Sequence, residues 1–422
     1  MRVHCLLFLL FCAAIMPANA QQTYFTVVNS KLIKTLQVKV AGEFISEPYI
    51  ELNGDQQIQI NFDALEQGGV RYSYSIIHCD ANWQKSILSP IQYMSGFQGL
   101  TIDDFANSIN TTTQYTNYNL LLPNEDIQFK VSGNYAVQIY NEDIPDQIVL
   151  TACFSVVEPM VGISASVSGN TDIDTNQTHQ QVSFTINNKN FPIPYPQTDL
   201  KIHVYQDNRR DNAVSGLQPT TILENQIGYT NNRSLIFSAG NEYRRMEFLS
   251  TKYNGMHIEN ISYHNPYYNV ELMTDHKRSD QTYQYDQDQD GRFFIRCSSC
   301  NDPDTEADYC IVHFALACDP LLDGNVYLNG ELFHNVLDEK SKMGYNFETH
   351  QYEKAVLLKQ GSYNYQYLFV PNGNTVGETG PIEGNYYQAE NEYTIYVYYR
   401  PMGIQYDRLI GVTSVKNAMQ VF

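Results

Sequence analysis

Apolar and polar residues alternate along short segments of this chain, and this pattern predicts β-strands. Residues 58–62 alternate as a strand with one buried face does. Residues 127–131 and 135–139 alternate likewise on either side of a Ser-Gly-Asn turn, so we expect them to pair as a β-hairpin. Residues 148–157 form an apolar, β-branched run that ends near Pro159. Because proline cannot donate to a ladder, we expect a first domain to close there.

Two further sets of strand-like segments follow. The second set comprises residues 161–167, 182–186 and 202–204, and the third comprises residues 310–316, 326–328, 355–358, 363–367 and 394–399. Polar residues 206–212 and 274–290 predict loops, and a short helix is expected only within residues 85–110. Short strands separated by Gly, Asn and Pro turns are typical of β-sandwiches. The predicted fold class is all-β, with tandem immunoglobulin-like or early-set β-sandwich domains.

An outer-membrane β-barrel is the structural alternative for a β-rich chain that ends in phenylalanine. A barrel requires even strands of about ten residues with an apolar lipid face. In this sequence the strand segments vary in length, and polar stretches interrupt them. The pattern therefore favours the sandwich.

The first twenty residues have the pattern of a secretory signal peptide. Arg2 supplies a basic start, Cys5–Met16 is apolar, and Ala18-Asn19-Ala20 is a small-residue cleavage site before Gln21. The apolar run is shorter than the ~18 residues that a membrane anchor needs. Neither cysteine of this segment, Cys5 or Cys12, ends a lipoprotein cleavage box, so we expect no lipid anchor.

The length of the remaining chain predicts several domains. A single core stops growing at roughly 250–300 residues, which is less than this chain holds after cleavage. We expect a signal peptide at residues 1–20, an N-terminal β-sandwich domain at 21–158, a middle β domain at 159–300 and a C-terminal early-set-like β-sandwich domain at 301–422.

The chain is strongly acidic. It has 26 basic and 46 acidic residues, for a net charge of −20. The expected signal peptide holds one basic and no acidic residue, so the mature chain has 25 − 46 = −21. Nucleic acid and anionic membranes repel such a charge, and neither is expected as a partner. The 33 Tyr and 20 Phe favour pleated, half-buried surfaces.

Six cysteines follow the signal peptide: Cys79, Cys153, Cys297, Cys300, Cys310 and Cys318. In an oxidising compartment spaced cysteines are expected to form disulfides. The last four could instead supply a four-thiolate zinc site, although their spacing is irregular. The sequence does not decide the pairing.

The sequence contains no familiar catalytic constellation. It lacks a His-Glu-x-x-His motif, a Gly-x-Ser-x-Gly elbow and a phosphate-binding loop. His78 precedes Cys79, but neighbours on a strand point to opposite faces, so the histidine is not expected to activate the thiol. No catalytic residue and no cofactor are predicted, and we expect a protein that is not an enzyme.

One acidic loop is a weak candidate for a calcium site. Asp286, Asp288 and Asp290, followed by Gly291, match the opening of a calcium-binding loop. Position 12 of that loop is Cys297, where a bidentate glutamate is needed. The alternative is an acidic Asp-Gly turn that leads into a strand.

The last predicted domain contains a pattern that suggests a second function. Residues 326–333, 343–345 and 358–363 look like the early-set sandwiches related to glycogen-binding modules, which stack exposed aromatic rings on sugars. The tryptophan usual after the Gly-x-Phe turn is missing, since residues 334–337 read His-Asn-Val-Leu. A secreted glycan-binding β-sandwich protein is therefore the alternative function.

Eight segments carry a family resemblance; in chain order they are residues 74–83, 132–135, 206–213, 240–244, 306–309, 358–363, 399–403 and 406–411. Together these segments resemble the plug family of the type IX secretion system of Bacteroidetes bacteria. They cover nearly the whole mature chain. Departures are small: Asp207 stands where Asn is expected, and Ile404-Gln405 replaces a more basic pair.

This resemblance implies a function. Members of the family are expected to be periplasmic proteins that bind the outer-membrane translocon barrel and plug its periplasmic opening while no substrate passes. The family offers no catalytic residues to carry over to this sequence.

Overall fold

A computed structural model describes residues 22–65 and 69–417. The expected signal peptide and its cleavage site before Gln21 lie outside the described residues. The described strands form seven sheets, which pack into three β-sandwiches. The predicted all-β sandwich class is confirmed. None of the helices in the described part of the chain has the length and apolar character needed to cross a membrane.

Sandwich 1 contains the strands up to residue 157. Its elements are β1 (Val27–Val28), β2 (Ile33–Val40), β3 (Tyr49–Glu51), β4 (Ile58–Ala64), β5 (Tyr72–Cys79), α1 (Pro90–Tyr93), β6 (Met94–Ser95), β7 (Leu100–Thr101), β8 (Phe105–Asn107), β9 (Thr116–Leu122), β10 (Gln128–Phe129), β11 (Gly133–Asn141) and β12 (Ile148–Val157). The sheet β1-β12-β11-β5-β7, with β3 beside β12, packs on the sheet β2-β4-β9-β8.

The alternation of residues 58–62 places Ile58, Ile60 and Phe62 in the core of sandwich 1, as predicted. The apolar run 148–157 forms β12, also as predicted. The helix expected within residues 85–110 is a single turn, α1, which begins after a capping box formed by Ser89.

The predicted hairpin of residues 127–131 and 135–139 is wrong. β10 pairs with β6, whereas β11 lies between β5 and β12. Alternation indicates a strand but not its partner. β11 pairs along its length with two long apolar strands, β5 and β12. The two-residue β10 could form far fewer cross-strand contacts with β11.

Sandwich 2 is assembled from two separate parts of the chain. The first part contains β13 (Gly162–Ser168), β14 (His179–Asn187), α2 (Pro196–Asp199), β15 (Leu200–Gln206), β16 (Val214–Ser215), β17 (Thr221–Leu223), β18 (Gln226–Tyr229), η1 (Arg233–Leu235) and β19 (Ile236–Ser238). The second part contains β30 (Glu392–Tyr399) and β31 (Arg408–Lys416). β30 pairs with β15, so the C-terminal strands complete a sheet whose β15 begins 392 − 200 = 192 residues earlier in the sequence.

Sandwich 3 is inserted between these two parts. It comprises β20 (Arg244–Phe248), β21 (Ile258–His264), β22 (Tyr267–Leu272), β23 (Asp275–His276), β24 (Phe293–Ile295), α3 (Pro303–Glu306), β25 (Tyr309–Ala317), β26 (Gly324–Asn329), η2 (Glu331–Phe333), β27 (Gly344–Asn346), β28 (Gln351–Lys359) and β29 (Gly361–Pro371). One sheet has the order β20-β29-β24, with β26 also beside β29, and the other has the order β21-β22-β25-β28-β27.

The pairing of strands crosses the domain boundary expected at residue 300. That residue lies within sandwich 3, between β24 and β25, and the strands after residue 391 return to sandwich 2. The division into domains at residues 158 and 300 stays a prediction.

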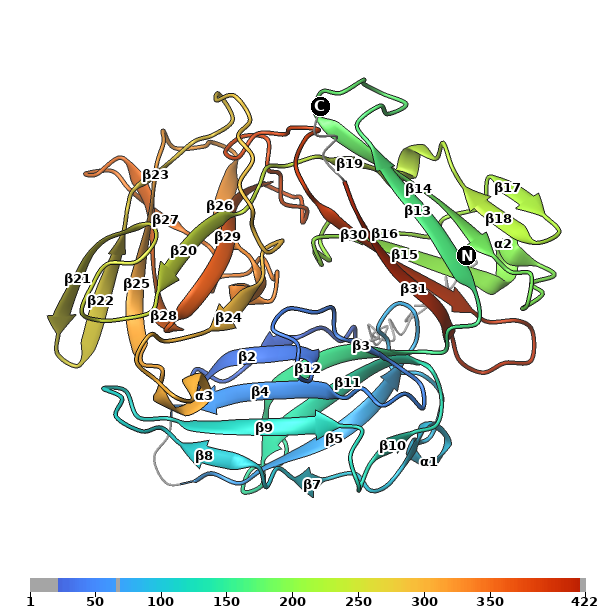
Figure 1. Ribbon diagram of the computed structural model, residues 1–422, viewed down its shortest axis with the longest axis horizontal. Coiled ribbons are helices and arrows are strands. Elements are labelled where there is room, and N and C mark those ends of the chain that lie inside the picture. Colours follow the sequence, from blue (N-terminus) through green and yellow to red (C-terminus); the bar gives the residue numbers. More distant parts are fainter. Residues whose placement is uncertain (1–21, 66–68, 418–422) are drawn as a thin grey trace, which may run out of the picture.

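The three sandwiches lie side by side around a common centre (Figure 1), sandwich 1 below, sandwich 2 at the upper right and sandwich 3 at the upper left. Two strands near this centre bury both of their faces. Residues 361–368 of β29 are buried without exception, and so are residues 393–399 of β30. In β30, Ile395 and Val397 lie in the core of sandwich 2. Tyr396 and Tyr398, on the other face of the strand, pack with Ala81 of sandwich 1.

Candidate functional site at the junction of the three sandwiches

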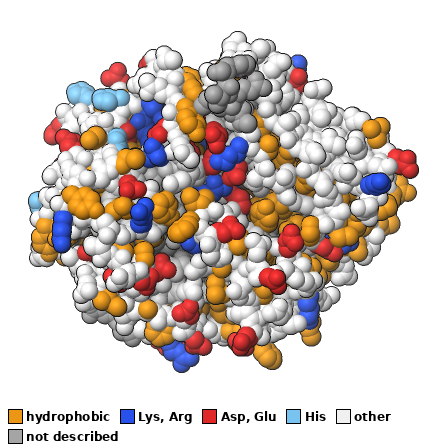
Figure 2. All heavy atoms as spheres, in the orientation of Figure 1, with side chains coloured by type: hydrophobic (Ala, Val, Ile, Leu, Met, Phe, Trp, Pro, Cys, Tyr) orange, Lys and Arg blue, Asp and Glu red, His pale blue; other side chains and the backbone are white. Residues whose placement is uncertain are grey.

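Charged side chains of both signs gather in the middle of one face of the molecule, where the sandwiches meet (Figure 2). Such groups are rarely buried unless they are paired and hydrogen-bonded. The junction is therefore expected to be held by ion pairs and hydrogen bonds among its charged and polar side chains. We take it as the candidate functional site.

Sandwiches 1 and 3 are joined by a buried ion pair between Asp63 of β4 and Lys359 of β28. The Lys359 Nζ lies 2.7 Å from Asp63 Oδ2, and the two side chains are 1% and 0% exposed. The Tyr309 hydroxyl donates to the same carboxylate oxygen at 2.6 Å, and the Asn117 amide donates to the other at 2.8 Å. The Lys359 ammonium also lies 4.2 Å from the centre of the Tyr115 ring. Both charges are thus satisfied inside the protein.

A second carboxylate strengthens the same contact. Asp308 accepts hydrogen bonds from the backbone N–H groups of Thr112 and Thr113, at 2.8 and 3.1 Å. The Tyr115 hydroxyl donates to the carbonyl oxygen of Ala307 at 2.8 Å. A loop of sandwich 1 is therefore held by the residues that precede β25.

Arg292 connects all three sandwiches. It comes just before β24 of sandwich 3, and its guanidinium forms ion pairs with Glu47 of sandwich 1 and with Glu392 at the start of β30. Burial opposes the charge of Arg292, but the two carboxylates more than offset this and raise its pKa above its usual range. Burial also raises the pKa of Glu47.

Sandwiches 1 and 2 meet through Asp407, which lies in the loop between β30 and β31 and is fully buried. Its carboxylate accepts from the backbone N–H of Ala81 and from Lys201 Nζ, both at 2.9 Å. The Tyr398 hydroxyl donates to Asn134 Oδ1 at 2.9 Å. The bonds to Ala81 and Asn134 tie C-terminal elements to the β5–β11 end of sandwich 1, whereas Lys201 belongs to β15 of sandwich 2.

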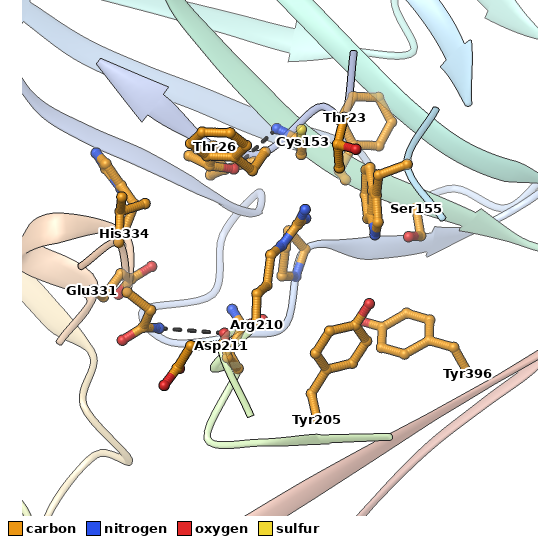
Figure 3. A pocket seen from close by; sticks show the side chains of 18 of the residues that line it. Thr23, Thr26, Cys153, Ser155, Tyr205, Arg210, Asp211, Glu331, His334 and Tyr396 are labelled. Atoms are coloured by element: carbon orange, nitrogen blue, oxygen red, sulfur yellow. Dashed lines mark hydrogen bonds between the residues drawn. The ribbon is translucent and has the colours of Figure 1, made fainter. Parts of the chain in front are cut away.

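A cavity of about 350 Å³ lies where the three sandwiches converge. Arg210 extends into it, with Tyr205 and Tyr396 on one side and Glu331 and His334 on the other (Figure 3). The guanidinium of Arg210 lies 4.4 Å from the centre of the Trp83 ring, and it donates to the carbonyl oxygen of Tyr24 at 2.9 Å. Arg210 thus joins sandwich 2 to sandwich 1 as well.

The aspartates of the candidate calcium loop already have protein partners. Asp286 forms an ion pair with Arg245 at 2.6 Å, and Asp290 forms one with Lys416 at 2.7 Å. Asp288 accepts a hydrogen bond from the backbone N–H of Asp290 at 2.8 Å, and burial raises its pKa to about 8. In residues 22–65 and 69–417 no group of three or more His, Cys, Asp or Glu side chains is placed to hold a metal ion.

The six cysteines after the expected signal peptide differ in burial and in bonding. Cys297 and Cys300 form a disulfide. Cys79, Cys153 and Cys310 are buried free thiols, and Cys318 is a half-buried one. The disulfide therefore uses two of the four thiols that the zinc alternative requires.

His78 and Cys79 belong to different packing environments, as expected for neighbours on a strand. His78 lies against the rings of Tyr135 and Tyr406, whereas Cys79 packs in a cluster with Trp83. Burial lowers the pKa of His78 to about 4 and raises the pKa of the Cys79 thiol. A neutral imidazole and a protonated thiol on opposite faces do not form a nucleophilic pair.

The segment that suggested glycan binding is packed into the protein. Phe333, at the end of the turn Gly330-Glu331-Leu332-Phe333, is half-buried against the core of sandwich 3. Exposed aromatic surface does occur nearby at Phe347, which is 76% exposed, but its neighbour Tyr345 meets it edge to face at 75°. The two rings do not form one flat platform.

Most of the segments quoted for the family resemblance contribute to the junction. They supply Ala81 and Trp83, Asn134, Arg210, Asp308 and Tyr309, Lys359, and Asp407. Glu47, Asp63 and Arg292 belong to none of these segments. Asp63 was detectable as a charge inside an apolar strand, whereas Glu47 and Arg292 lie in loops without any comparable signal.

Comparison with known proteins assigns part of the chain to a family. Residues 33–158 match the family described as "Type 9 secretion system plug protein 1st domain". Residues 33–158 belong to the type IX secretion system plug protein family. The chain is therefore a protein associated with type IX secretion, and the matched segment corresponds to sandwich 1 without β1.

A solved structure resembles this protein over almost its whole length. It is the crystal structure of a hypothetical protein from Parabacteroides merdae ATCC 43184, which is 80% identical, with a TM-score of 0.93. The match covers 94% of this chain and 100% of the other. No curated protein matches the chain.

Proposed function

We propose that the protein is a non-enzymatic periplasmic subunit of the type IX secretion system, which binds and plugs the periplasmic opening of the outer-membrane translocon barrel. The observation that carries this proposal is the set of buried ion pairs that lock the three sandwiches together. A body that obstructs a wide pore must keep its shape under load, and these contacts connect every pair of sandwiches.

The strength of the junction supports a steric role. Removing one partner of a buried ion pair typically costs about 3–5 kcal/mol, because the other charge stays buried without compensation. Lys359 with Asp63, and Arg292 with Glu47 and Glu392, are pairs of this kind. Movement of one sandwich against another would break them together, so the resting arrangement is strongly favoured.

The charge of the chain supports a reversible interaction with its partner. An acidic surface attracts a basic rim through forces that salt screens over about 10 Å at 0.1 M. We therefore expect the complex to weaken as the salt concentration rises. A moderate interface with a polar rim allows the plug to leave when a substrate passes.

The test measures leakage through the outer membrane. A deletion strain should take up hydrophilic dyes and antibiotics that the wild type excludes, while secretion is at least partly retained. A double deletion that also lacks the barrel should not leak. Leakage that persists without the barrel, or no leakage in the single deletion, rejects the plug and favours the glycan-binding alternative. Retention of the protein on glycan columns measures that alternative directly.

A further inference from the structure

A second groove runs between sandwiches 1 and 3 and shares Leu36, His334 and Val336 with the junction cavity. It encloses about 360 Å³. Residues 27–36 of sandwich 1 form one wall, and residues within 332–340 and 354–358 of sandwich 3 form the other. We call it the lysine groove, after the side chains described below.

The wall formed by sandwich 3 is the open edge of a strand. β28 pairs with β25 over its whole length, but on its other side it pairs with β27 only at Gln351–Glu353. The five consecutive residues 354–358 all line the groove. Side chains alternate across a strand, so a consecutive run along one cavity means that the backbone edge faces it. Among the described residues no strand pairs with residues 354–358 on this side, although β2 of sandwich 1 lies close to β28. The backbone N–H and C=O groups of this edge are open to pairing where β2 leaves room.

The charge of the groove is opposite to that of the whole chain. Lys31, Lys34, Lys340 and Lys354 line it, with Asp338 as the single acidic lining residue. Across the chain acidic residues outnumber basic ones by 46 to 26. None of the four lysines forms an ion pair with a carboxylate of residues 22–65 or 69–417. The excess of lysines in this groove, in a protein that is acidic overall, favours a negatively charged ligand.

Two of these lysines donate to neutral backbone groups, although the charges of Asp338 and Glu339 also act on Lys354. Lys340 Nζ donates to the carbonyl oxygen of Val28 at 2.6 Å, and Lys354 Nζ donates to that of Lys342 at 2.7 Å. Burial, together with the charge of Lys340, lowers the pKa of Lys34. A carboxylate bound in the groove would raise the pKa of Lys34 again, because its negative charge compensates the buried positive charge of the lysine.

The floor of the groove is apolar. Leu332, Phe333 and Val356 line it and pack against the core of sandwich 3. A ligand that fits must therefore present apolar groups on one side and negative charges on the other. An extended peptide does this when apolar and acidic residues alternate.

We propose that the lysine groove binds an extended acidic peptide segment of a partner protein, which adds as a strand along the open edge of β28. Main-chain hydrogen bonds to residues 354–358 supply affinity, apolar side chains contact the floor, and carboxylates contact the lysines. The inference is independent of the plug role, since it needs no translocon.

The experiment measures binding of a fluorescent decapeptide of alternating valine and glutamate to the full mature protein by anisotropy. Saturable binding that weakens at high salt is expected. The double variant Lys34→Glu/Lys354→Glu should lose about tenfold or more in affinity. The matched control is Lys189→Glu/Lys252→Glu, which makes the same charge change at two exposed lysines outside the groove and should bind as the wild type does.

Two further peptides separate charge from strand addition. A valine–lysine decapeptide tests charge, and a valine–glutamate peptide with central prolines tests backbone pairing, because proline cannot donate to a ladder. Both should bind at least tenfold more weakly. If Lys34→Glu/Lys354→Glu fails to fold by circular dichroism, Lys34→Gln/Lys354→Gln replaces it. The proposal is overturned by absence of saturable binding, by equal binding of either control peptide, by unchanged affinity of the groove variant, or by binding only to anionic phospholipid vesicles.

Discussion

Replacement of Lys359 by methionine should separate the stability of sandwich 1 from that of the rest of the molecule. Methionine keeps most of the side-chain volume but removes the ammonium group that faces Asp63. The carboxylate of Asp63, which is fully buried, would then retain only the Tyr309 hydroxyl and the Asn117 amide as donors. Its negative charge would have no compensating cation at the contact between sandwiches 1 and 3.

The expected cost follows from the burial of both partners. Breaking such a pair from one side typically costs about 3–5 kcal/mol of unfolding free energy. The two remaining donors to Asp63 place the expected loss near the lower end, at about 3 kcal/mol. Asp63→Asn should cost a similar amount, because Lys359 keeps only the carbonyl oxygen of Asp304 and the Tyr115 ring. The double variant carries no buried charge at this site, and its unfolding free energy should lie within about 1–2 kcal/mol of that of the wild type.

The assay uses the single tryptophan of the chain. Trp83 belongs to sandwich 1, so its fluorescence in a urea titration reports that sandwich, while far-ultraviolet circular dichroism reports all strands. In the wild type the two transitions should coincide, and in Lys359→Met the fluorescence transition should come at lower urea. Lys342→Met is the control, since its pair with Glu339 is exposed and is worth less than about 1 kcal/mol. A loss below about 1 kcal/mol in Lys359→Met, or single costs that simply add in the double variant, would refute the reasoning.

Three further predictions concern titration, calcium and thiols. The pKa of His78 falls from 6.5 to about 4 on burial, so below pH 6.5 the unfolded chain binds more protons than the folded one, and stability drops as the pH falls. His78→Gln should reduce the stability difference between roughly pH 7 and pH 5.5 by about 1 kcal/mol, measured by urea unfolding at both values; an unchanged difference would show that His78 is not buried as a neutral ring. Calcium should leave the melting temperature unchanged, because the aspartates of the candidate loop already bind Arg245, Lys416 and backbone N–H groups; a rise that Asp288→Asn abolishes would contradict this. A thiol reagent should label Cys318 in the native protein faster than the three buried thiols, as peptide mapping by mass spectrometry can measure, and equal rates would contradict the burial described above.

Local pattern predicted the strands well, because alternation depends only on which face each residue buries. The segments 58–62, 148–157 and 182–186 became strands with their apolar residues in the core. Partners were harder to predict. The expected hairpin around residue 133 failed because β11 found longer partners in β5 and β12. Strand pairing depends on contacts between distant segments, and local periodicity contains no information about these contacts.

The insertion of sandwich 3 between the two parts of sandwich 2 was equally difficult to predict from the sequence. Residues 394–399 were assigned by order along the chain to the last predicted domain, yet β30 pairs with β15. One signal in the sequence did point to the junction. Residues 394–399 contain no alternating polar positions, and such a strand buries both faces. The family resemblance identified many segments that contribute to the junction, but it did not predict the contacts between them. Contacts such as that of Arg292 with Glu47 join residues far apart in the sequence, and these two residues lie outside the segments.

The polar character of the junction follows from what it must specify. Apolar contacts between two sandwiches tolerate sliding, since any apolar surface that is removed from water contributes in proportion to its area. Ion pairs and hydrogen bonds in a buried contact tolerate only one register, because each displaced partner leaves an unsatisfied charge. The chain adds a second constraint. It enters sandwich 3 after β19 and returns to sandwich 2 at β30, so any rotation of sandwich 3 must move both connections, and Glu392, the partner of Arg292, lies at the second of them. Connectivity and charge therefore restrict the same motion, which favours one fixed arrangement of the three sandwiches.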